Sequence, residues 1–358
     1  MKRNVQIISA IASALFFAAA GCRSVGPATL NQDRMDYLSA LSDSWKSQML
    51  LNLVKTRYLD APVFLDVASL ISQYSIESDV SLGAGWQANP FVANQTLGAG
   101  GKYTDRPTIT YSPLTGEKFA RSFMRPIPPA AVMQMIESGY RADLVMRVCV
   151  QAVNGLHNRR GNAPQAREAD PDFYRLIGKL KTIQQAGRLA VRLQEQADKT
   201  LTMIVFEPKE DAAMQAEVSE VSGLLGIAPG TREIRVVYGS AASTNTEIAM
   251  QTRSMLQILM DLASQIEVPE QDVAEKRVPP TFHGDPSLAE YAAPLVRIQS
   301  SSGKPADAFV SVPYRGKWFW IDDRDCPSKS IFSFLMFMFS LTETGGKGEA
   351  PVVTISTG

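Results

Sequence analysis

The tetrad at 301–304, Ser-Ser-Gly-Lys, is the segment whose residue types come nearest to a nucleophile with its base. In the S-x-x-K arrangement of serine acyl-transferases that act on cell-wall peptides, the serine hydroxyl attacks an acyl group and the lysine assists proton transfer. Such a nucleophile begins a helix, whereas here Pro305 follows directly and the surroundings indicate a polar turn. Because no S-D-N or K-T-G companion lies downstream, Ser301 gives a cell-wall hydrolase only remote support.

Metal ligands are the second chemistry to consider. His157 and His283 lie in polar segments outside any H-E-x-x-H or cysteine-rich pattern, so the sequence predicts no zinc site. The acidic cluster at 322–325 holds three aspartates but lacks the central Gly and terminal Glu of a calcium loop. We expect these aspartates to form ion pairs with nearby basic side chains, the candidates being Arg315, Lys317 and Arg324.

A phosphate-binding loop is suggested only by the composition of one glycine-rich stretch. Gly98, Gly100 and Gly101 have no strand-turn-helix context, and Lys102 is followed by Tyr103 instead of Ser or Thr. A flexible connection is the favoured interpretation. The whole chain has 36 basic and 36 acidic residues, a balance that gives no reason to expect a nucleic-acid partner. The sequence therefore predicts no cofactor and no nucleic-acid binding.

Two interpretations of Cys149 and Cys326 stay open. In an oxidising compartment they could form a disulfide that joins distant parts of the chain. Alternatively they are two separate buried thiols, which the apolar helical stretch around Cys149 favours. Spacing alone does not decide, because a disulfide requires the two Cα atoms to lie within about 7 Å.

The densest concentration of aromatic and charged residues lies at 312–325. If Gly316-Lys317 turns a hairpin, Trp318 and Trp320 share one face of a strand and Phe319 points to the other. Together with Tyr314, the two tryptophans could bind a partner or stack on a glycan ring. The alternative is core packing with a charged rim, because aromatic strands are usually buried.

Cys22 is the candidate for covalent lipid attachment. A basic N-terminus and an apolar segment of about 16 residues precede Ala19-Ala20-Gly21-Cys22, an order typical of a lipoprotein signal peptide. Such a segment is shorter than the roughly 20 residues that cross a bilayer. We expect residues 1–21 to be a signal peptide and residues 22–30 a lipidated tether.

A competing interpretation is ordinary secretory cleavage. Residues 18–20 also fit an A-x-A site, and Ala19 stands where a lipobox usually has Leu, so a soluble periplasmic protein is the minority alternative. Arg23, where an inner-membrane lipoprotein often has Asp, favours the outer membrane by resemblance to enterobacterial sorting. The expected location is the periplasmic side of the outer membrane of a Gram-negative bacterium, with the lipid on Cys22 as the membrane contact.

Hydrophobic periodicity indicates a mixture of helices and strands without strict βαβ alternation. Helices are predicted at 31–58, 128–138, 142–156, 171–185, 211–225, 246–266 and 327–341. Strands are predicted at 61–81, 108–111, 187–194, 200–206, 232–238, 295–299, 308–313, 317–321 and 352–355. The predicted fold class is α+β with small, mostly antiparallel sheets. A polar stretch at 157–170 suggests two α+β domains, 31–165 and 166–358.

Two predicted helices are unusually apolar. The segment 331–341 is apolar nearly all round, and the segment 246–266 is rich in methionine. Either could be a central buried helix or could dock onto a partner or the bilayer interface, because methionine suits adaptable surfaces as well as cores.

Three segments, APVFLDVASLISQYS, DRPTITYSPLTGEKFARSFMRPIP and VSVPYRGKWFWIDDRD, together with the later SFLMFMFSL, resemble those of a family of uncharacterised proteobacterial lipoproteins. The resemblance covers most of the chain after the leader. It implies a lipidated, envelope-facing protein and carries over no catalytic residue.

These observations predict a non-enzymatic lipoprotein of the envelope that is structural or binds an envelope protein partner. A periplasmic binder of a small molecule or glycan, with a pocket walled by Tyr314, Trp318 and Trp320, is the alternative. A cell-wall hydrolase is a remote alternative.

Overall fold

The computed structural model describes residues 25–71, 74–84, 95–105, 108–161, 166–196, 199–206, 211–283, 291 and 293–343. Helices and small sheets are mixed in it, which confirms the predicted α+β class. The described chain divides into two compact units: one takes its residues from 25–45 and 66–112, the other from 46–65 and 113–343. Cys22, the leader and the predicted strand at 352–355 lie outside the described residues.

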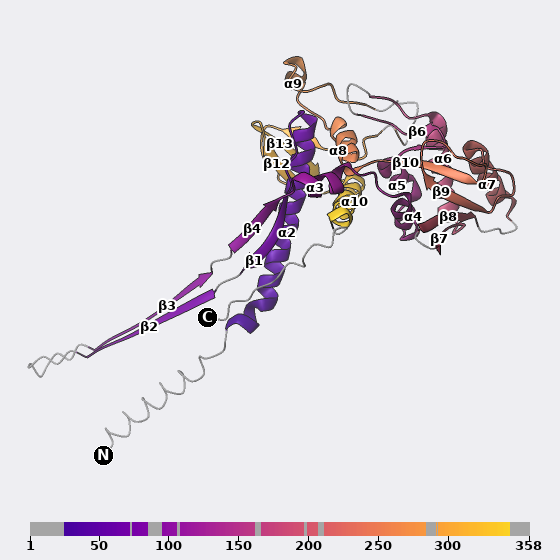
Figure 1. The fold of residues 1–358 in the computed structure, drawn as a ribbon. Helices are drawn as coiled ribbons and strands as arrows, with labels where there is room; N and C mark the ends of the chain where they lie inside the picture. The colour runs from indigo at the N-terminus through magenta and orange to yellow at the C-terminus, as the bar shows by residue number, and fades with distance from the viewer. Residues whose placement is uncertain are drawn as a thin grey trace, which may run out of the picture. The chain divides into compact units, whose positions relative to one another are not determined.

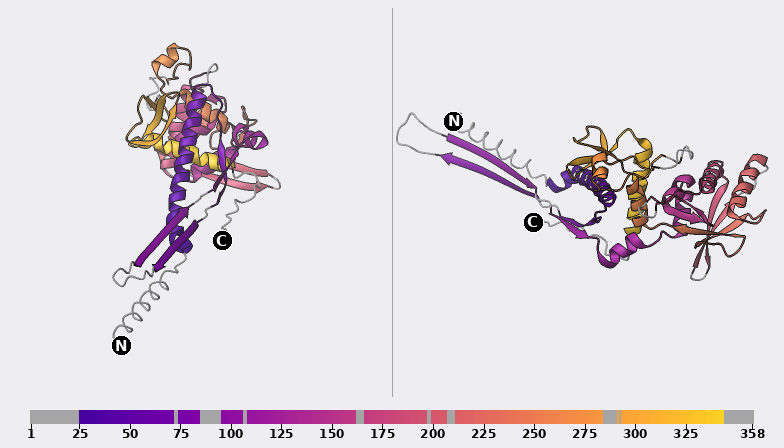
Figure 2. Two further views of the ribbon diagram at one scale, coloured as in Figure 1. Left: turned by 90° about the vertical axis from the view of Figure 1, so that its left-hand side faces the viewer. Right: turned by 90° about the horizontal axis from the view of Figure 1, so that it is seen from above.

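The first unit contains the N-terminal part of a long helix and two pairs of strands. Helix α2 (Val25–Arg57) begins earlier than the sequence pattern predicted. Strands β2 (Tyr74–Ala84) and β3 (Gln95–Asp105) pair antiparallel over 11 residues each, and both further views show them side by side (Figure 2). A second pair joins β1 (Leu65–Ile71) to β4 (Thr108–Pro113). The glycines predicted to lie in a flexible connection are therefore part of strand β3, because cross-strand hydrogen bonding holds their backbone.

The second unit contains a sheet of six described strands in the order β6-β5-β10-β9-β8-β7. All neighbours are antiparallel except β9 and β10, which are parallel. The strands are β5 (Val150–Val153), β6 (Leu156–His157), β7 (Leu189–Gln196), β8 (Lys199–Phe206), β9 (Glu233–Tyr238) and β10 (Glu247–Thr252). Because β5 pairs with β10, the predicted domain boundary at 165/166 would divide a single sheet, and the units of the structure separate elsewhere.

Two predicted helices are in fact each part helix and part strand. The helix expected over 142–156 ends at Cys149 as α5 (Ala142–Cys149), and β5 follows, turning into β6 through Asn154 and Gly155, both with positive φ. Asn-Gly is the preferred pair for such a two-residue hairpin turn. The helix expected over 246–266 is β10 followed by α8 (Met255–Ser264), which starts at a capping box formed by Ser254 and Gln257.

Helices α4 to α7 accompany the six-stranded sheet (Figure 1), and side chains from all four line an apolar seam against it. They are α4 (Pro129–Glu137), α5, α6 (Pro171–Gln185) and α7 (Ala212–Leu225). Prolines begin α4 and α6, where a missing N–H costs nothing, and Asp211 caps α7 by accepting hydrogen bonds from the N–H groups of Ala213 and Met214.

The remainder of this unit consists of a three-stranded antiparallel sheet, in the order β11-β13-β12, and of further helices. Its strands are β11 (Gln299–Ser301), β12 (Ala308–Tyr314) and β13 (Lys317–Asp322). The further helical elements are α3 (Gly116–Phe119), the π-helical turn η1 (Ala120–Met124), α8, α9 (Glu270–Ala274) and α10 (Cys326–Glu343). Helix α10 buries Phe332, Phe334 and Leu335, while Phe337 and Leu341 remain exposed, so it is mainly a core helix.

Candidate partner-binding surfaces

The aromatic segment predicted from the sequence is the hairpin of β12 and β13. Its turn is Arg315-Gly316, with φ of 48° and 76°, one residue earlier than the predicted Gly316-Lys317. Two consecutive residues with positive φ are what a tight type I′ turn requires. The resulting register sets Tyr314 opposite Lys317 and Pro313 opposite Trp318.

The predicted alternation along β13 is confirmed. Phe319 and Ile321 are fully buried and lie opposite Val312 and Val310 of β12. Trp318 and Trp320 belong to the other face and are half-buried. The strand therefore contributes its inner face to the core and leaves the two tryptophans on a partly exposed face.

The 299–304 segment lies beside this tryptophan face. The register sets Trp318 opposite Ser301 and Trp320 opposite Gln299. The ammonium of Lys304 lies 5.5 Å from the centre of the Trp318 ring, a cation–π distance. The indole nitrogen of Trp320 is buried and has no hydrogen-bond partner among the described residues, which is rare for a buried donor.

Tyr314 does not join the two tryptophans. Its ring packs edge to face against Tyr58 with ring centres 5.4 Å apart, and its hydroxyl donates to the Asp60 carboxylate at 3.0 Å. Arg315 lies over both tyrosine rings. Because Tyr314 is one residue out of phase with Trp318 across the ladder, it belongs to the opposite face of the hairpin. The three rings therefore do not wall one pocket.

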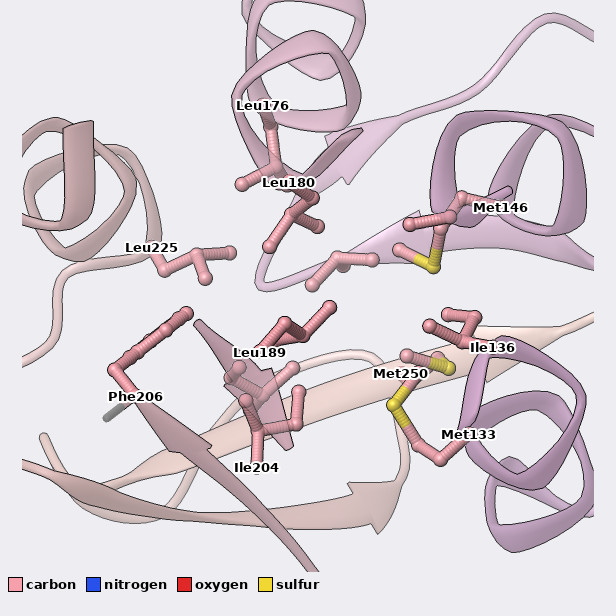
Figure 3. Close-up of a pocket in the computed structure, with 13 residues that line it drawn as sticks. Met133, Ile136, Met146, Leu176, Leu180, Leu189, Ile204, Phe206, Leu225 and Met250 are labelled. Atoms are coloured by element: carbon pink, nitrogen blue, oxygen red, sulfur yellow. The ribbon is translucent and has the colours of Figure 1, made fainter. Parts of the chain in front are cut away.

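Neither of two hollows in the described part of the chain contains these rings. One is the seam between α4 to α7 and the six-stranded sheet, lined only by apolar side chains such as Met133, Met146 and Met250 that point towards one another (Figure 3). Its cavity volume is about 20 Å³, far below the roughly 300 Å³ of small-molecule sites. It is a packing gap of the core.

The second hollow is larger, about 450 Å³, but open to solvent. It lies between the β5–β6 turn, the end of α7 and residues 240–245. The Asn154 amide at its edge is already used, since it donates to the Leu225 carbonyl at 2.7 Å and accepts from the Ala249 N–H at 2.7 Å. Among the described residues, none of the buried polar atoms that lack a partner belongs to its lining.

The serine–lysine pair of the 301–304 tetrad is not arranged for nucleophilic chemistry. The Ser301 hydroxyl donates to the Gly303 carbonyl at 2.8 Å, and Lys304 is directed to the Trp318 ring. Ser301 ends strand β11 and does not begin a helix. The geometry that a serine nucleophile needs is therefore missing from this pair.

The remaining polar candidates form hydrogen bonds or ion pairs with other side chains. His157 Nδ1 lies 3.3 Å from an Asp170 carboxylate oxygen. In the acidic cluster, Asp323 pairs with Lys329 at 2.7 Å, so its partner differs from the basic residues predicted, and Arg324 instead pairs with Asp307. Within the described residues no group of three His, Cys, Asp or Glu side chains could hold a metal ion.

The two cysteines of the body are free thiols in the structure, so the disulfide that the sequence left open is not formed. Cys149 is buried at the end of α5, and Cys326 is exposed at the start of α10. Burial raises the pKa of the Cys149 thiol to about 12, which keeps it protonated and unreactive.

Sequence reasoning missed a buried cluster of charge. Asp261 lies 3.4 Å from both Arg159 and Arg253, and all three side chains are about 5 % exposed. Its other oxygen accepts from the Gly161 N–H at 2.8 Å. No local pattern indicates this cluster, because Arg159 and Asp261 are separated by about a hundred residues. Its charged members are paired, which indicates a structural role.

Helix α2 has an apolar stripe of which only a part is buried. Met49 and Leu53 are buried in the core, whereas Met35, Leu38 and Trp45 are 57 %, 52 % and 40 % exposed. All five recur at three-, four- and seven-residue steps, the spacing of one helix face. The α2 stripe, defined as Met35, Leu38 and Trp45, is thus an exposed apolar surface on a regular helix.

Comparisons of the chain with protein-family models, with curated proteins and with solved structures gave no match. Among the helices of the described chain, none is both long and apolar enough to cross a membrane.

Proposed function

We propose that this chain is a lipid-anchored envelope protein without enzymatic activity, which serves as a structural or partner-binding component on the periplasmic side of the outer membrane. The leader that ends at Cys22 and the resemblance to proteobacterial lipoproteins support the location. The observation that carries the partner-binding role is the α2 stripe.

The stripe fits an interface because its spacing is regular and because the next turns of the same helix are buried. Positions 35, 38 and 45 lie on the face that, from Met49 onwards, is buried in core packing. Burying side chains of this size stabilises by about 1.5–3 kcal/mol each, so three together supply an appreciable share of a protein–protein contact. The partner we expect is an envelope protein that offers an apolar groove to an amphipathic helix.

The alternative of a glycan or small-molecule binder finds less support, because the Tyr314 ring and the two tryptophans belong to opposite faces of their hairpin. The hydrolase alternative has still less support, because the Ser301 hydroxyl donates a hydrogen bond to a backbone carbonyl.

Site-specific photo-cross-linking in cells tests the proposal. A photoreactive residue at Leu38 should give a discrete cross-linked protein species, whereas the same residue at Asp36, on the opposite side of the helix, should give none. Equal cross-linking yields at the two positions, or no cross-linked species from either, would contradict the partner-binding role.

A separate experiment tests the lipid anchor. The wild-type chain should fractionate with outer membranes and carry lipid by intact mass, and the Cys22→Ala chain should lose the lipid. An unmodified wild-type Cys22 would remove the lipid anchor from the proposal and leave secretion into the periplasm.

A further inference from the structure

The tryptophan face is the side of the three-stranded sheet that carries Trp318 and Trp320. Directly opposite residues of an antiparallel ladder point to the same side of a sheet. On the central strand β13, Trp320 therefore lies between Gln299 of β11 and Ser311 of β12. Trp318 has Ser301 of β11 as its neighbour in the same way. The face thus carries two indole rings, on positions about 6.8 Å apart along the strand, with polar side chains beside them.

The polar side chains beside Trp320 are free to bond to a ligand. Within the described residues, neither Gln299 nor Ser311 forms a side-chain hydrogen bond or an ion pair. Both are half-buried, yet none of their polar atoms is among the buried atoms without a partner, so the amide and the hydroxyl reach solvent. An amide group and a hydroxyl group can each donate and accept hydrogen bonds. The two side chains therefore suit a ligand that is rich in hydroxyl groups.

The N–H edge of the Trp320 ring lacks an acceptor. This donor is closed off from solvent and has no hydrogen-bond partner among the described residues, although a buried donor normally has one. It has lost its hydration without a replacement, which is unfavourable. The Trp320 side chain as a whole is nevertheless only half-buried. A ligand oxygen that reaches this edge of the ring would supply the missing acceptor.

The charge beside Trp318 is positive. Lys304 is exposed, its ammonium lies 5.5 Å from the centre of the Trp318 ring, and it has no acidic partner in the described part of the chain. At the other end of β13 the Asp322 carboxylate accepts a hydrogen bond from the Arg324 N–H at 2.8 Å. A ligand with a negative group is therefore complementary to the Trp318 end of the face, where the Lys304 ammonium can bond to a carboxylate.

A sugar acid combines the properties that this face calls for. The C–H groups of a saturated sugar ring carry a partial positive charge, which suits the negative face of an indole ring. Its hydroxyl groups can bond to Gln299 and Ser311, and its carboxylate complements Lys304. A nucleic acid would also stack on indole rings, but its affinity depends on many phosphate contacts, and a chain of balanced charge with one lysine at this face does not offer them.

We propose that the tryptophan face binds an acidic glycan, a chain of sugar rings that carry carboxylates. Sugar rings stack on Trp318 and Trp320, and a carboxylate pairs with Lys304. Gln299 and Ser311 form hydrogen bonds with the hydroxyl groups of the ring that stacks on Trp320.

This site differs from the pocket predicted from the sequence, because it is an open face and does not include Tyr314. It is also a different surface from the α2 stripe, and it does not depend on a lipid at Cys22. The outcome of its test is therefore separate from the outcomes of the cross-linking and anchor experiments.

Calorimetric titration of the full chain with Cys22→Ala tests the class of ligand. The probe is hexagalacturonate, and its matched control is the same hexamer with every carboxyl group reduced to an alcohol. Polyglutamate is a second control that supplies negative charge without sugar rings. We expect hexagalacturonate to bind at least about tenfold more tightly than either control, because only it offers both rings and carboxylates. Equal affinity for one of the controls, or no binding of hexagalacturonate, overturns the proposal.

Matched variants in the same chain test the residues. Lys304→Gln should weaken hexagalacturonate binding at least about fivefold, because the carboxylate loses its charged partner, and Lys304→Arg should retain the binding. Lys317→Gln removes the same charge from the opposite face of β13 and should leave the affinity unchanged. Equal effects of the Lys304→Gln and Lys317→Gln substitutions contradict the proposal.

The indole N–H of Trp320 reports on the site directly. In the nitrogen-15-labelled chain its NMR signal is identified by its loss in Trp320→Phe. At saturation with hexagalacturonate this signal should shift as the N–H gains an acceptor, whereas the signal of Trp45 on the α2 stripe should stay in place. A Trp320 signal that does not move, or that moves no more than the Trp45 signal, contradicts the proposal.

Discussion

The guanidinium of Arg253 and the carboxylate of Asp261 lie 3.4 Å apart inside the core, with side chains that are only 5 % and 6 % exposed. Arg253 also donates to the backbone carbonyl of Arg147 at 3.1 Å and to that of Arg159. Burial lowers the pKa of Arg253, and the charge of Asp261 opposes that decrease. The pair therefore connects α8 to the end of α5 and to the 158–161 segment.

Removal of Asp261 should be strongly destabilising. In Asp261→Ala two buried guanidiniums lose their carboxylate, and breaking a buried ion pair in this way costs about 3–5 kcal/mol. Asp261→Asn keeps an oxygen for the Gly161 N–H and should lose less. Urea unfolding followed by tryptophan fluorescence measures both. A loss below about 1 kcal/mol in the alanine variant would show that the pair contributes little.

The hydroxyl of Tyr58 should contribute more than that of Tyr314. Tyr58 is buried and donates to Asp272 at 2.6 Å, whereas the bond from Tyr314 to Asp60 is exposed. Hydrogen bonds to charged groups contribute about 1.5–3 kcal/mol when buried, so Tyr58→Phe should lower the free energy of unfolding by about that amount. Tyr314→Phe is the matched control and should lose less than half as much. Equal losses in thermal or urea unfolding would contradict this ranking.

Cys149 should make stability fall at alkaline pH. Its pKa is raised from about 9 in the unfolded chain to about 12 in the folded protein, so the folded state retains a proton that the unfolded state has released. The stabilisation is fully present below pH 9 and is lost as the pH rises towards 12. Urea unfolding at pH 8 and at pH 10 should give a smaller decrease for Cys149→Ala than for wild type. Identical decreases would mean that Cys149 does not titrate as its burial implies.

The Arg315-Gly316 turn should be sensitive to any side chain at its second position. Gly316 has a φ of 76°, and the left-handed region costs an L residue about 1–2 kcal/mol, so Gly316→Ala should destabilise by about that amount. Gly303→Ala is the control, because its added Cβ would meet nothing within 4 Å and its backbone is not left-handed. Thermal unfolding should show a lower Tm for Gly316→Ala only.

Local patterns predicted much of the secondary structure. Helices α6 and α7 begin where the sequence predicts them, with Pro171 in the first turn of α6 and Asp211 as the cap of α7, because capping and proline geometry act within one helical turn. The same kind of signal was overlooked at Asn154-Gly155, where a hairpin turn interrupts the helix predicted from apolar periodicity. Short apolar segments such as 247–252 fit both the helical period and the strand period. Pairing with the neighbouring strands β5 and β9 decides that this segment is a strand.

By itself the sequence determined the two faces of β13 and the apolar stripe of α2, since each depends only on residue order and on the period of one element. Tertiary structure alone decided that Tyr314 is separated from Trp318 and Trp320, that Arg159 and Arg253 meet Asp261, and that one sheet crosses the predicted domain boundary. These relationships depend on strand register and on contacts between segments far apart in the chain. Many packings satisfy the same local pattern, and only the packing that satisfies buried charges and backbone groups together is realised.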